Sequence, residues 1–243
     1  MNTFNGKNAV VFLDFDNTIT TYDVFDNMLL QFSEDDTWKD LEERWKNNEI
    51  GSRECLEGQI KTISVTKKAL DEYLGRVELD PYFKRLLHFL RAKRIKTVVL
   101  SDNFDYLLSR ILSKNGIRGL KIYSNKARLA GGRLVPSFPF TGKKCRVCAH
   151  CKKKNLLSNV NGHSMTIYVG DGQSDACPAK YVNKVFAKEA LLDYCRTEGI
   201  SHIPYKNLKE VYEYLIPLFE KKRGEGAVGA PQKEYKNGKD RKN

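Results

Sequence analysis

The sequence predicts an α/β protein, a doubly wound parallel sheet with a small helical cap inserted after the first strand. Three observations predict this class. Apolar runs rich in β-branched residues recur along the chain, as is typical of strands buried on both faces of a parallel sheet. Amphipathic helical segments alternate with these runs, which implies right-handed crossovers. A long charged stretch of helical periodicity separates the first run from the others.

The composition is that of an ordinary globular protein and narrows the classes of function. The chain has 243 residues, 41% of them hydrophobic, and can bury a large core. It has no apolar stretch of eighteen residues and no secretory pattern, and its six cysteines suggest reduced thiols, so we expect a cytoplasmic protein without membrane contact. The net charge of +12 suggests an anionic partner, but no basic-aromatic platform supports nucleic-acid binding.

The first predicted strand, VVFL at residues 10–13, is followed at once by two carboxylates. Asp14 and Asp16 stand where the carboxyl end of a parallel strand meets the ligand-binding edge of the sheet. Neighbouring carboxylates repel each other, and a divalent cation shared between them would keep both ionised. An exposed acidic turn is the alternative interpretation of this string taken alone.

Residues 23–80 are predicted to form the helical cap, because apolar residues recur there at helical spacing and no strand-like run interrupts them. The catalytic core is assigned to residues 1–22 and 81–218, and residues 219–243 to a basic tail that we expect to be disordered. Four polar residues where the cap begins are expected to face the site: Tyr22, Asp23, Asp26 and Asn27. Asp23 and Asp26 either attract an amine of the substrate or act as helix N-terminal acids.

The remaining elements of the core follow in alternating order. Amphipathic helices are predicted at 82–93, 106–115 and 208–222, and a short helix after the string CRVCAHC. Strands are predicted at 95–103, 165–169 and 182–188, with a strand and a hairpin over 120–135.

Three of the predicted strands end in polar clusters, DFD, SDN and GDGQSD, which should converge at one edge of the sheet. With a lysine ahead of the last cluster, this order resembles the haloacid-dehalogenase superfamily of phosphohydrolases, whose four motifs match DFDNT, VVLSDN, a lysine of CKKKN and GDGQSD. The resemblance covers residues 8 to about 215. Within the superfamily the chain is similar to methionine-salvage phosphatases acting on 2-hydroxy-3-keto-5-methylthiopentenyl phosphate, and to phosphoethanolamine/phosphocholine phosphatases.

The resemblance implies a Mg²⁺-dependent phosphomonoesterase that acts on a small phosphorylated metabolite. Asp14 would attack phosphorus and form an aspartyl-phosphate, while Asp16 would protonate the leaving group and then activate water. The phosphoryl oxygens would be held by Ser101 and Lys152. The expected Mg²⁺ ligands are Asp14, the backbone carbonyl of Asp16, and Asp171. Asp175 would act behind them, through water or by holding Lys152, and the expected substrate contacts are Asp23, Asp102, Asn103 and Gly172.

Several alternatives stay open at this point. A phosphomutase of the same superfamily, or a non-catalytic phosphate-binding protein on this fold, would share most of these residues. Phosphoserine is disfavoured as substrate, because Asp23 stands where phosphoserine phosphatases carry glutamate, and their cap arginine has no clear match. Neither the metabolite nor the oligomeric state is defined by any feature of the sequence.

The cysteine-rich string leaves two further points open. Lys153 and Lys154 adjoin Lys152, which is chosen because it directly follows the last cysteine. The spacing of Cys145, Cys148 and Cys151, with His150 among them, can hold zinc or an iron–sulfur cluster. A shaped loop of reduced thiols is the alternative that we favour, because no fourth ligand lies at ordinary spacing.

Overall fold

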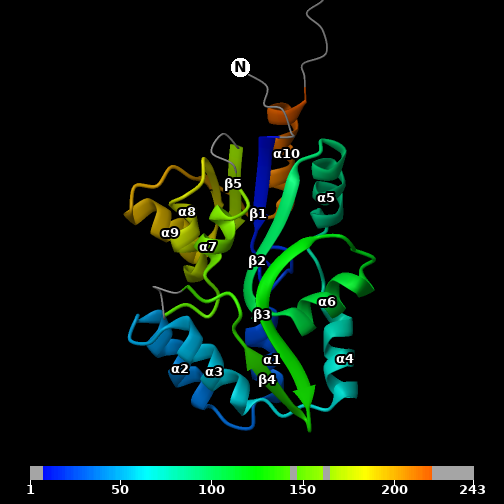
Figure 1. Cartoon of the computed structure of the whole chain (residues 1–243), viewed down its shortest axis with the longest axis vertical. Coiled ribbons are helices and arrows are strands. Elements are labelled where there is room, and N and C mark those ends of the chain that lie inside the picture. The colour runs from blue at the N-terminus through cyan, green and yellow to red at the C-terminus, as the bar shows by residue number, and fades with distance from the viewer. Residues whose placement is uncertain (1–7, 143–146, 161–164, 221–243) are drawn as a thin grey trace, which may run out of the picture.

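The computed structural model describes residues 8–142, 147–160 and 165–220, and these form an α/β core with a group of helices at one end (Figure 1). The strands are β1 (Ala9–Leu13), β2 (Lys96–Phe104), β3 (Lys121–Ala130), β4 (Arg133–Ser137), β5 (Met165–Gly170), β6 (Lys184–Ala187) and β7 (Ile203–Pro204). They make one sheet of order β4-β3-β2-β1-β5-β6-β7, in which all neighbouring strands are parallel except β3 and β4. The predicted fold class is confirmed.

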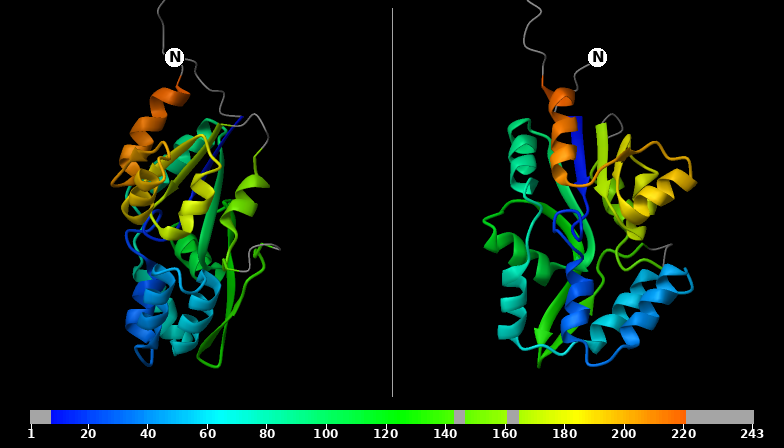
Figure 2. Two further views of the ribbon diagram at one scale, coloured as in Figure 1. Left: turned by 90° about the vertical axis from the view of Figure 1, so that its left-hand side faces the viewer. Right: turned by 180° about the vertical axis from the view of Figure 1, so that it is seen from behind.

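β1 lies at the centre of the sheet because every one of its side chains is apolar and buried. Val11 and Leu13 belong to the large apolar cluster on one face, with α5 (Phe83–Ala92), α6 (Asp105–Lys114) and α10 (Leu208–Phe219). Val10 and Phe12 point to the other face, where Leu156 of α7 (Lys152–Leu157) covers them. Figure 2 shows α10 and α7 on opposite sides of the sheet. The alternation therefore produces the three layers that a doubly wound sheet requires.

Two further helices, α8 (Ala176–Ala179) and α9 (Glu189–Thr197), pack beside α7 and cover β6. None of the helices in the described part of the chain combines the length and the hydropathy that a membrane crossing requires. α10 ends at Phe219, so the predicted basic tail from residue 221 onward lies outside the described residues.

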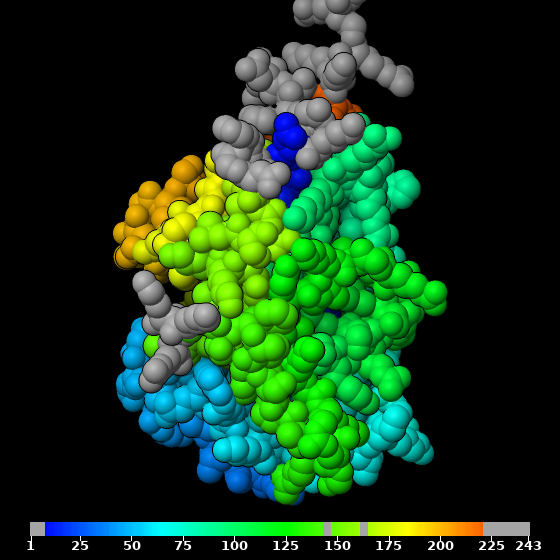
Figure 3. Space-filling view, in the orientation of Figure 1, coloured from blue at the N-terminus to red at the C-terminus, as the bar shows by residue number. Residues whose placement is uncertain are grey.

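Four helices lie between β1 and α5, within the stretch assigned to the cap: α1 (Val24–Phe32), α2 (Thr37–Lys46), α3 (Ser52–Thr62) and α4 (Lys67–Arg76). They are joined to the core by two adjacent connections, which pair through an isolated bridge between Thr20 and Leu79. The amide of Asp80 also donates to the carbonyl of Ile19 at 2.8 Å. In the space-filling view these helices close the end of the molecule next to the hairpin (Figure 3).

The β3–β4 hairpin, predicted around Gly131–Gly132, reaches the four helices instead of staying within the core. Both glycines have positive φ, which the two-residue turn of a hairpin requires. The amide of Val65 donates to the carbonyl of Gly132 at 2.9 Å, and Arg133 forms an ion pair of 2.7 Å with Glu34. The hairpin thus provides a second attachment of the four helices to the core.

A third attachment joins α3 to the loop that precedes α7. The amide of Arg53 donates to the carbonyl of Val147 at 3.1 Å, and the amide of Ala149 donates to the Ser52 hydroxyl at 3.0 Å. Gly51 allows this approach, because a Cβ at that position would lie 2.4 Å from the Val147 oxygen. The loop leading into α7 is therefore held directly by the cap.

This close approach predicts the effect of adding one methyl group. Gly51→Ala should lower the free energy of unfolding by about 1–3 kcal/mol, because backbone must move to make room. Gly75→Ala is the matched control, since a Cβ there meets nothing within 4 Å. It should leave the free energy of unfolding unchanged or raise it by up to about 1 kcal/mol. Urea unfolding measures both variants, and a Gly51→Ala protein as stable as the wild type would contradict the close packing.

Candidate active site

A pocket of about 120 Å³ lies between the carboxyl ends of β1, β2 and β5 and the helices of the cap. Core residues that line it include Asp14, Asp16, Asp102, Asn103, Lys152 and Asp171. A wider cleft of about 890 Å³ adjoins it. Both cavities are bordered by Trp45, Ser52, Asp102, Gln173 and Ser174. The polar clusters predicted to converge thus face one pocket.

Lys152 is the central contact of this pocket. Its side chain is 2% exposed, and its ammonium donates to Asp14 Oδ1 at 2.6 Å, Asp175 Oδ1 at 2.7 Å and Ser174 Oγ at 2.8 Å. These contacts use all three donors of an ammonium group. Burial alone would lower the pKa of Lys152, but the carboxylates of Asp14 and Asp175 outweigh burial and raise it.

The two lysines that follow point elsewhere. The ammonium of Lys153 donates to the hydroxyl of Tyr181 and lies over its ring, and Lys154 is exposed. Of the three adjacent lysines, the structure therefore places Lys152 in the pocket. Its contact with a phosphate stays a prediction.

Asp14 is buried at the end of β1, where its amide donates to the carbonyl of Val169 at 2.9 Å. Burial raises the pKa of its carboxyl well above the usual value, and the negative charge of Asp175 adds to that rise. The ammonium of Lys152 acts in the opposite direction. Lys152 is thus the neighbouring cation that favours the charged form of this carboxylate.

Asp16 is oriented by donors from two directions. The amide of Val24 donates to Oδ1 at 3.0 Å, and Asn103 Nδ2 contacts both carboxylate oxygens at 3.0 and 3.1 Å. Burial raises the pKa of Asp16 to about 6. The Ser101 hydroxyl is fully buried and accepts a hydrogen bond from the backbone amide of Asn103 at 3.0 Å. Asn103, predicted to contact the substrate, therefore commits its side-chain amide to Asp16.

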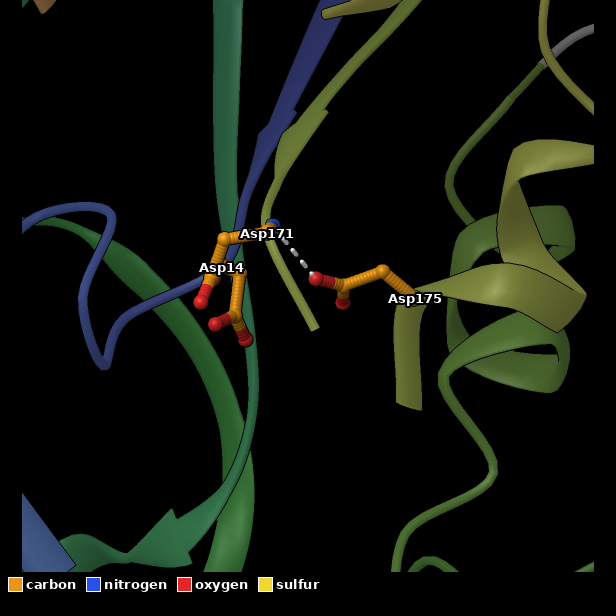
Figure 4. Close-up of side chains that lie close together, drawn as sticks. All are labelled: Asp14, Asp171 and Asp175. Atoms are coloured by element: carbon orange, nitrogen blue, oxygen red, sulfur yellow. Dashed lines mark hydrogen bonds between the residues drawn. The ribbon is translucent and has the colours of Figure 1, made fainter. Parts of the chain in front are cut away.

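Asp171 and Asp175 lie beside Asp14, as Figure 4 shows, but their surroundings differ. Asp171 accepts hydrogen bonds from Thr18 Oγ1 and Asn17 Nδ2, both at 3.0 Å, and burial raises its pKa to about 7. Asp175 Oδ2 accepts from the amides of Asp171 and Gly172, at 3.0 and 3.1 Å. Its Oδ1 accepts from Lys152 and, at 2.6 Å, from the Tyr168 hydroxyl, so four donors occupy this carboxylate.

The three carboxylates of Asp14, Asp171 and Asp175 offer oxygen atoms that all lie within 4.8 Å of one another. Carboxylate oxygens are the donors that Mg²⁺ prefers, so the chemistry of this group fits that ion. Asp175 is already saturated by N–H and O–H donors, which leaves Asp14 and Asp171 as the members able to turn an oxygen toward a cation.

Acidic side chains also line the cap side of the pocket. Asp23 Oδ1 accepts from the amide of Asp26 at 2.9 Å and caps α1, and both carboxylates border the pocket together with Glu42. Asp23 therefore caps the helix and also borders the pocket, while attraction of a substrate amine stays a prediction. The other two residues that were expected to face the site where the cap begins, Tyr22 and Asn27, do not line the pocket. Asn27 accepts a hydrogen bond from Gln31.

Together with Ser52 of α3, Asp102 borders both cavities. Burial raises its pKa to about 6. Its Oδ1 is buried and has no hydrogen-bond partner among the described residues. Gly172 also borders the pocket, with its amide bonded to Asp175.

The sequence analysis did not identify Glu42 and Trp45 of α2, or Ser52 of α3, as pocket residues. No local signal marks them, because their approach to the core depends on how the cap is oriented. Ser174 was also missed, although it lies inside the GDGQSD string, so its place in that motif could have indicated it.

The cysteine string is described only in part. Cys145 lies outside the described residues, as does His163, so the metal interpretation of the three cysteines stays untested. Cys151 precedes α7, and both ring nitrogens of His150 are engaged by Ser101 and Asn155. Among the described residues, the carboxylate group above is the one cluster with metal-binding geometry.

Comparison with known proteins identifies relatives over most of the chain. A family model described as "Putative Phosphatase" matches residues 9–192. A 2-hydroxy-3-keto-5-methylthiopentenyl-1-phosphate phosphatase of Microcystis aeruginosa is 25% identical over 210 residues, covering 85% of this chain and 97% of the relative. A phosphatase of the same name from Bacillus cereus (strain ATCC 10987 / NRS 248) is 24% identical and covers 87% of this chain and 98% of the relative.

Solved structures share the fold. A HAD family hydrolase from Salmonella enterica subsp. enterica serovar Typhi superposes with a TM-score of 0.69 at 17% identity, covering 88% of this chain and 72% of the other. A substrate-bound phosphoserine phosphatase gives a TM-score of 0.67 at 16% identity, with coverage of 86% and 98%. Because the family model matches well over half of the sequence, the chain belongs to the "Putative Phosphatase" family and is a phosphatase of the haloacid-dehalogenase superfamily.

Proposed function

We propose that the protein hydrolyses a small phosphorylated metabolite through an aspartyl-phosphate formed on Asp14, with Mg²⁺ as cofactor. The observation that carries the proposal is the convergence of Asp14, Asp16 and Asp171 around the single ammonium of Lys152. A nucleophile, an acid–base group, an anion-binding group and a pair of metal ligands thus share one pocket of about 120 Å³.

The metal would be held by Asp14, Asp171 and the backbone carbonyl of Asp16, and it would neutralise charge on the phosphoryl oxygens. The negative charge of the site supports a cation there. Three clustered carboxylates face one ammonium, and burial raises the pKa of both Asp14 and Asp171. A dianionic phosphate would be repelled by this excess unless a cation offset it.

In the first step, an oxygen of Asp14 attacks phosphorus, and the bond from phosphorus to the leaving oxygen breaks. Asp16 gives its proton to that leaving oxygen. The Lys152 ammonium, 2.6 Å from Asp14 Oδ1, orients the nucleophile. A phosphoryl oxygen would bind it by replacing one of its three present acceptors, the neutral Ser174 hydroxyl. The Ser101 hydroxyl is proposed to bind a second phosphoryl oxygen.

In the second step, the carboxylate of Asp16 takes a proton from water, which attacks phosphorus and releases phosphate and free Asp14. One residue can serve both steps because the first leaves it deprotonated for the second. The contacts from Val24 and Asn103 keep its carboxylate in one orientation through both steps.

The size and the lining of the pocket support a small leaving group. Asp23, Asp26 and Glu42 provide acceptors on the cap side, and Phe25 and Trp45 provide apolar surface. Such a lining accommodates a compact group that carries hydrogen-bond donors. Assay of the purified protein with Mg²⁺ against a panel of phosphorylated metabolites tests the function, and release of inorganic phosphate distinguishes hydrolysis from transfer by a mutase.

A cytoplasmic location is part of the proposal. It is supported by Cys55 and Cys195, which are buried free thiols of the kind found in reducing compartments.

Asp14→Asn tests the nucleophile. The amide has the shape of the carboxylate but cannot form the acyl phosphate, so turnover should fall by at least about a thousandfold while the thermal midpoint changes little. Asp193→Asn, which changes an exposed carboxylate of α9 in the same way, should keep wild-type turnover. Phosphate release near the wild-type rate in Asp14→Asn would rule out this mechanism.

Asp171→Ala tests the metal ligand. The substitution removes a carboxylate from the pocket and leaves the apolar residues of β5 in place, so activity should collapse at moderate Mg²⁺ concentrations. Added Mg²⁺ should raise the thermal midpoint of the wild type but not of the variant, because binding to the folded state alone stabilises it. An equal rise in both proteins would exclude Asp171 as a ligand.

Lys152→Met and Lys153→Met form a matched pair of adjacent changes. Loss of the Lys152 ammonium should lower kcat/KM by about a hundredfold or more, since charge on the transferring group loses its buried partner. Loss of the Lys153 ammonium removes only a surface contact with Tyr181 and should change kcat/KM less than about twofold. Steady-state assays measure kcat/KM for both variants. Equal losses in the two would contradict the choice of Lys152 as the lysine that acts in the pocket.

A further inference from the structure

His150 is a buried imidazole that the proposed reaction steps do not use. It lies two residues before Lys152, and its side chain is fully buried. Its Nδ1 lies 2.9 Å from the carbonyl oxygen of Ser101, and its Nε2 lies 2.6 Å from Asn155 Nδ2. The ring therefore spans the gap between the end of β2 and the start of α7.

These partners define the state of the ring. A carbonyl oxygen can only accept, so Nδ1 must carry a hydrogen and donate to Ser101. Nε2 then has a free lone pair, which accepts from the Asn155 amide. Burial and, after it, the charge of Lys152 lower the pKa of His150 to about 3, so the ring is neutral. A neutral imidazole in this orientation satisfies both neighbours.

The Ser101 carbonyl needs a partner from outside the sheet. The pairing of β2 with β3 is regular up to Leu100 and shifts register before Phe104, so the residues between them leave the ladder. Side chains from elsewhere satisfy the carbonyls in this interval, since His150 donates to Ser101 and Asn125 donates to Asp102. The irregular interval carries the Ser101 hydroxyl at its start.

The loop that carries His150 is anchored on three sides. The Ala149 amide donates to Ser52 of the cap at 3.0 Å, and the Cys151 amide donates to the Phe140 carbonyl at 2.9 Å. His150 supplies the contact to β2. Without its ring, the start of α7 would keep its contacts to the cap and to Phe140 but lose its bond to the strand that carries Ser101.

We infer that His150 is a positioning residue, which holds Ser101 and Lys152 at the separation that phosphate binding requires. The inference rests on the proposed function, because it assigns both groups to the phosphoryl oxygens. His150 does not line the pocket around Asp14 and Lys152, although it borders the adjoining cleft. It acts through the two segments that it joins, and a small error in their spacing weakens both contacts to the same anion.

Three substitutions at this position separate the Nδ1 donor from the bulk of the ring. His150→Leu fills the space and removes both polar atoms. His150→Gln places its amide near Nε2 and leaves the Ser101 carbonyl without a donor. His150→Asn places an amide nitrogen at the position of Nδ1 and keeps that donor, so it is the conservative variant. His202→Leu is the matched control, because His202 Nδ1 also bonds a backbone carbonyl, that of Ile200, at 2.8 Å.

The test measures the affinity for inorganic phosphate by calorimetry in the presence of Mg²⁺, together with kcat and KM for p-nitrophenyl phosphate. A role in folding alone would lower the fraction of active molecules and so lower kcat, but active molecules would bind phosphate as the wild type does. A role in positioning changes the affinity itself. The two explanations therefore differ in the dissociation constant for phosphate, whatever happens to the thermal midpoint.

We expect His150→Leu and His150→Gln to weaken phosphate binding about tenfold and to lower kcat/KM about tenfold to a hundredfold. His150→Asn should stay within about threefold of the wild type, and His202→Leu should match it. Wild-type phosphate affinity in the leucine and glutamine variants would overturn the inference. A wild-type protein that binds phosphate without hydrolysing any phosphomonoester would instead overturn the proposed function, and the binding series would still decide the role of His150.

Discussion

The arrangement of the site depends on one buried cation. The Lys152 ammonium has almost no contact with solvent, and a buried charge is tolerated only where close partners replace its hydration. Those partners come from separate parts of the chain, because Asp14 ends β1 while Ser174 and Asp175 belong to the turn after β5. The core can close around Lys152 only when β1, β5 and α7 all meet at this point.

The same group of charges favours the proposed chemistry. Lys152 offsets one carboxylate, while Asp14, Asp171 and Asp175 together supply three. Burial and, after it, repulsion from Asp175 raise the pKa of Asp14 and Asp171, and the local excess of negative charge favours a bound cation. It also explains why an anionic substrate would bind best with a metal present, since the cation offsets the repulsion between phosphate and carboxylates.

Much of the fold could be predicted from the sequence because β1, β2 and β5 are apolar runs that end in polar motifs. Choosing Lys152 over Lys153 rested on its place beside the last cysteine. The physical reason appears only in three dimensions, where the first turn of α7 sends adjacent side chains in different directions. Asn103 was predicted to contact the substrate; it lines the pocket, and its side-chain amide is bonded to Asp16. The periodicity of a sequence does not specify distances, and distances decide which of two nearby acceptors an amide bonds. Contacts between the cap and the core could not be predicted for the same reason.

The attachments of the cap bear on how a metabolite reaches the pocket. A simple hinge has one line of attachment, yet in the described part of the chain the four helices bond to the core at the hinge, at the β3–β4 hairpin and at the loop before α7. A rotation that admits substrate must break two of these or carry the hairpin and the loop along. Because that loop leads directly into Lys152, the second course would pull the ammonium away from Asp14 each time the cap opened. With the cap open, ligand could exchange with solvent, and with the cap closed, Lys152 would be in place beside Asp14. The protein could not be in both states at once.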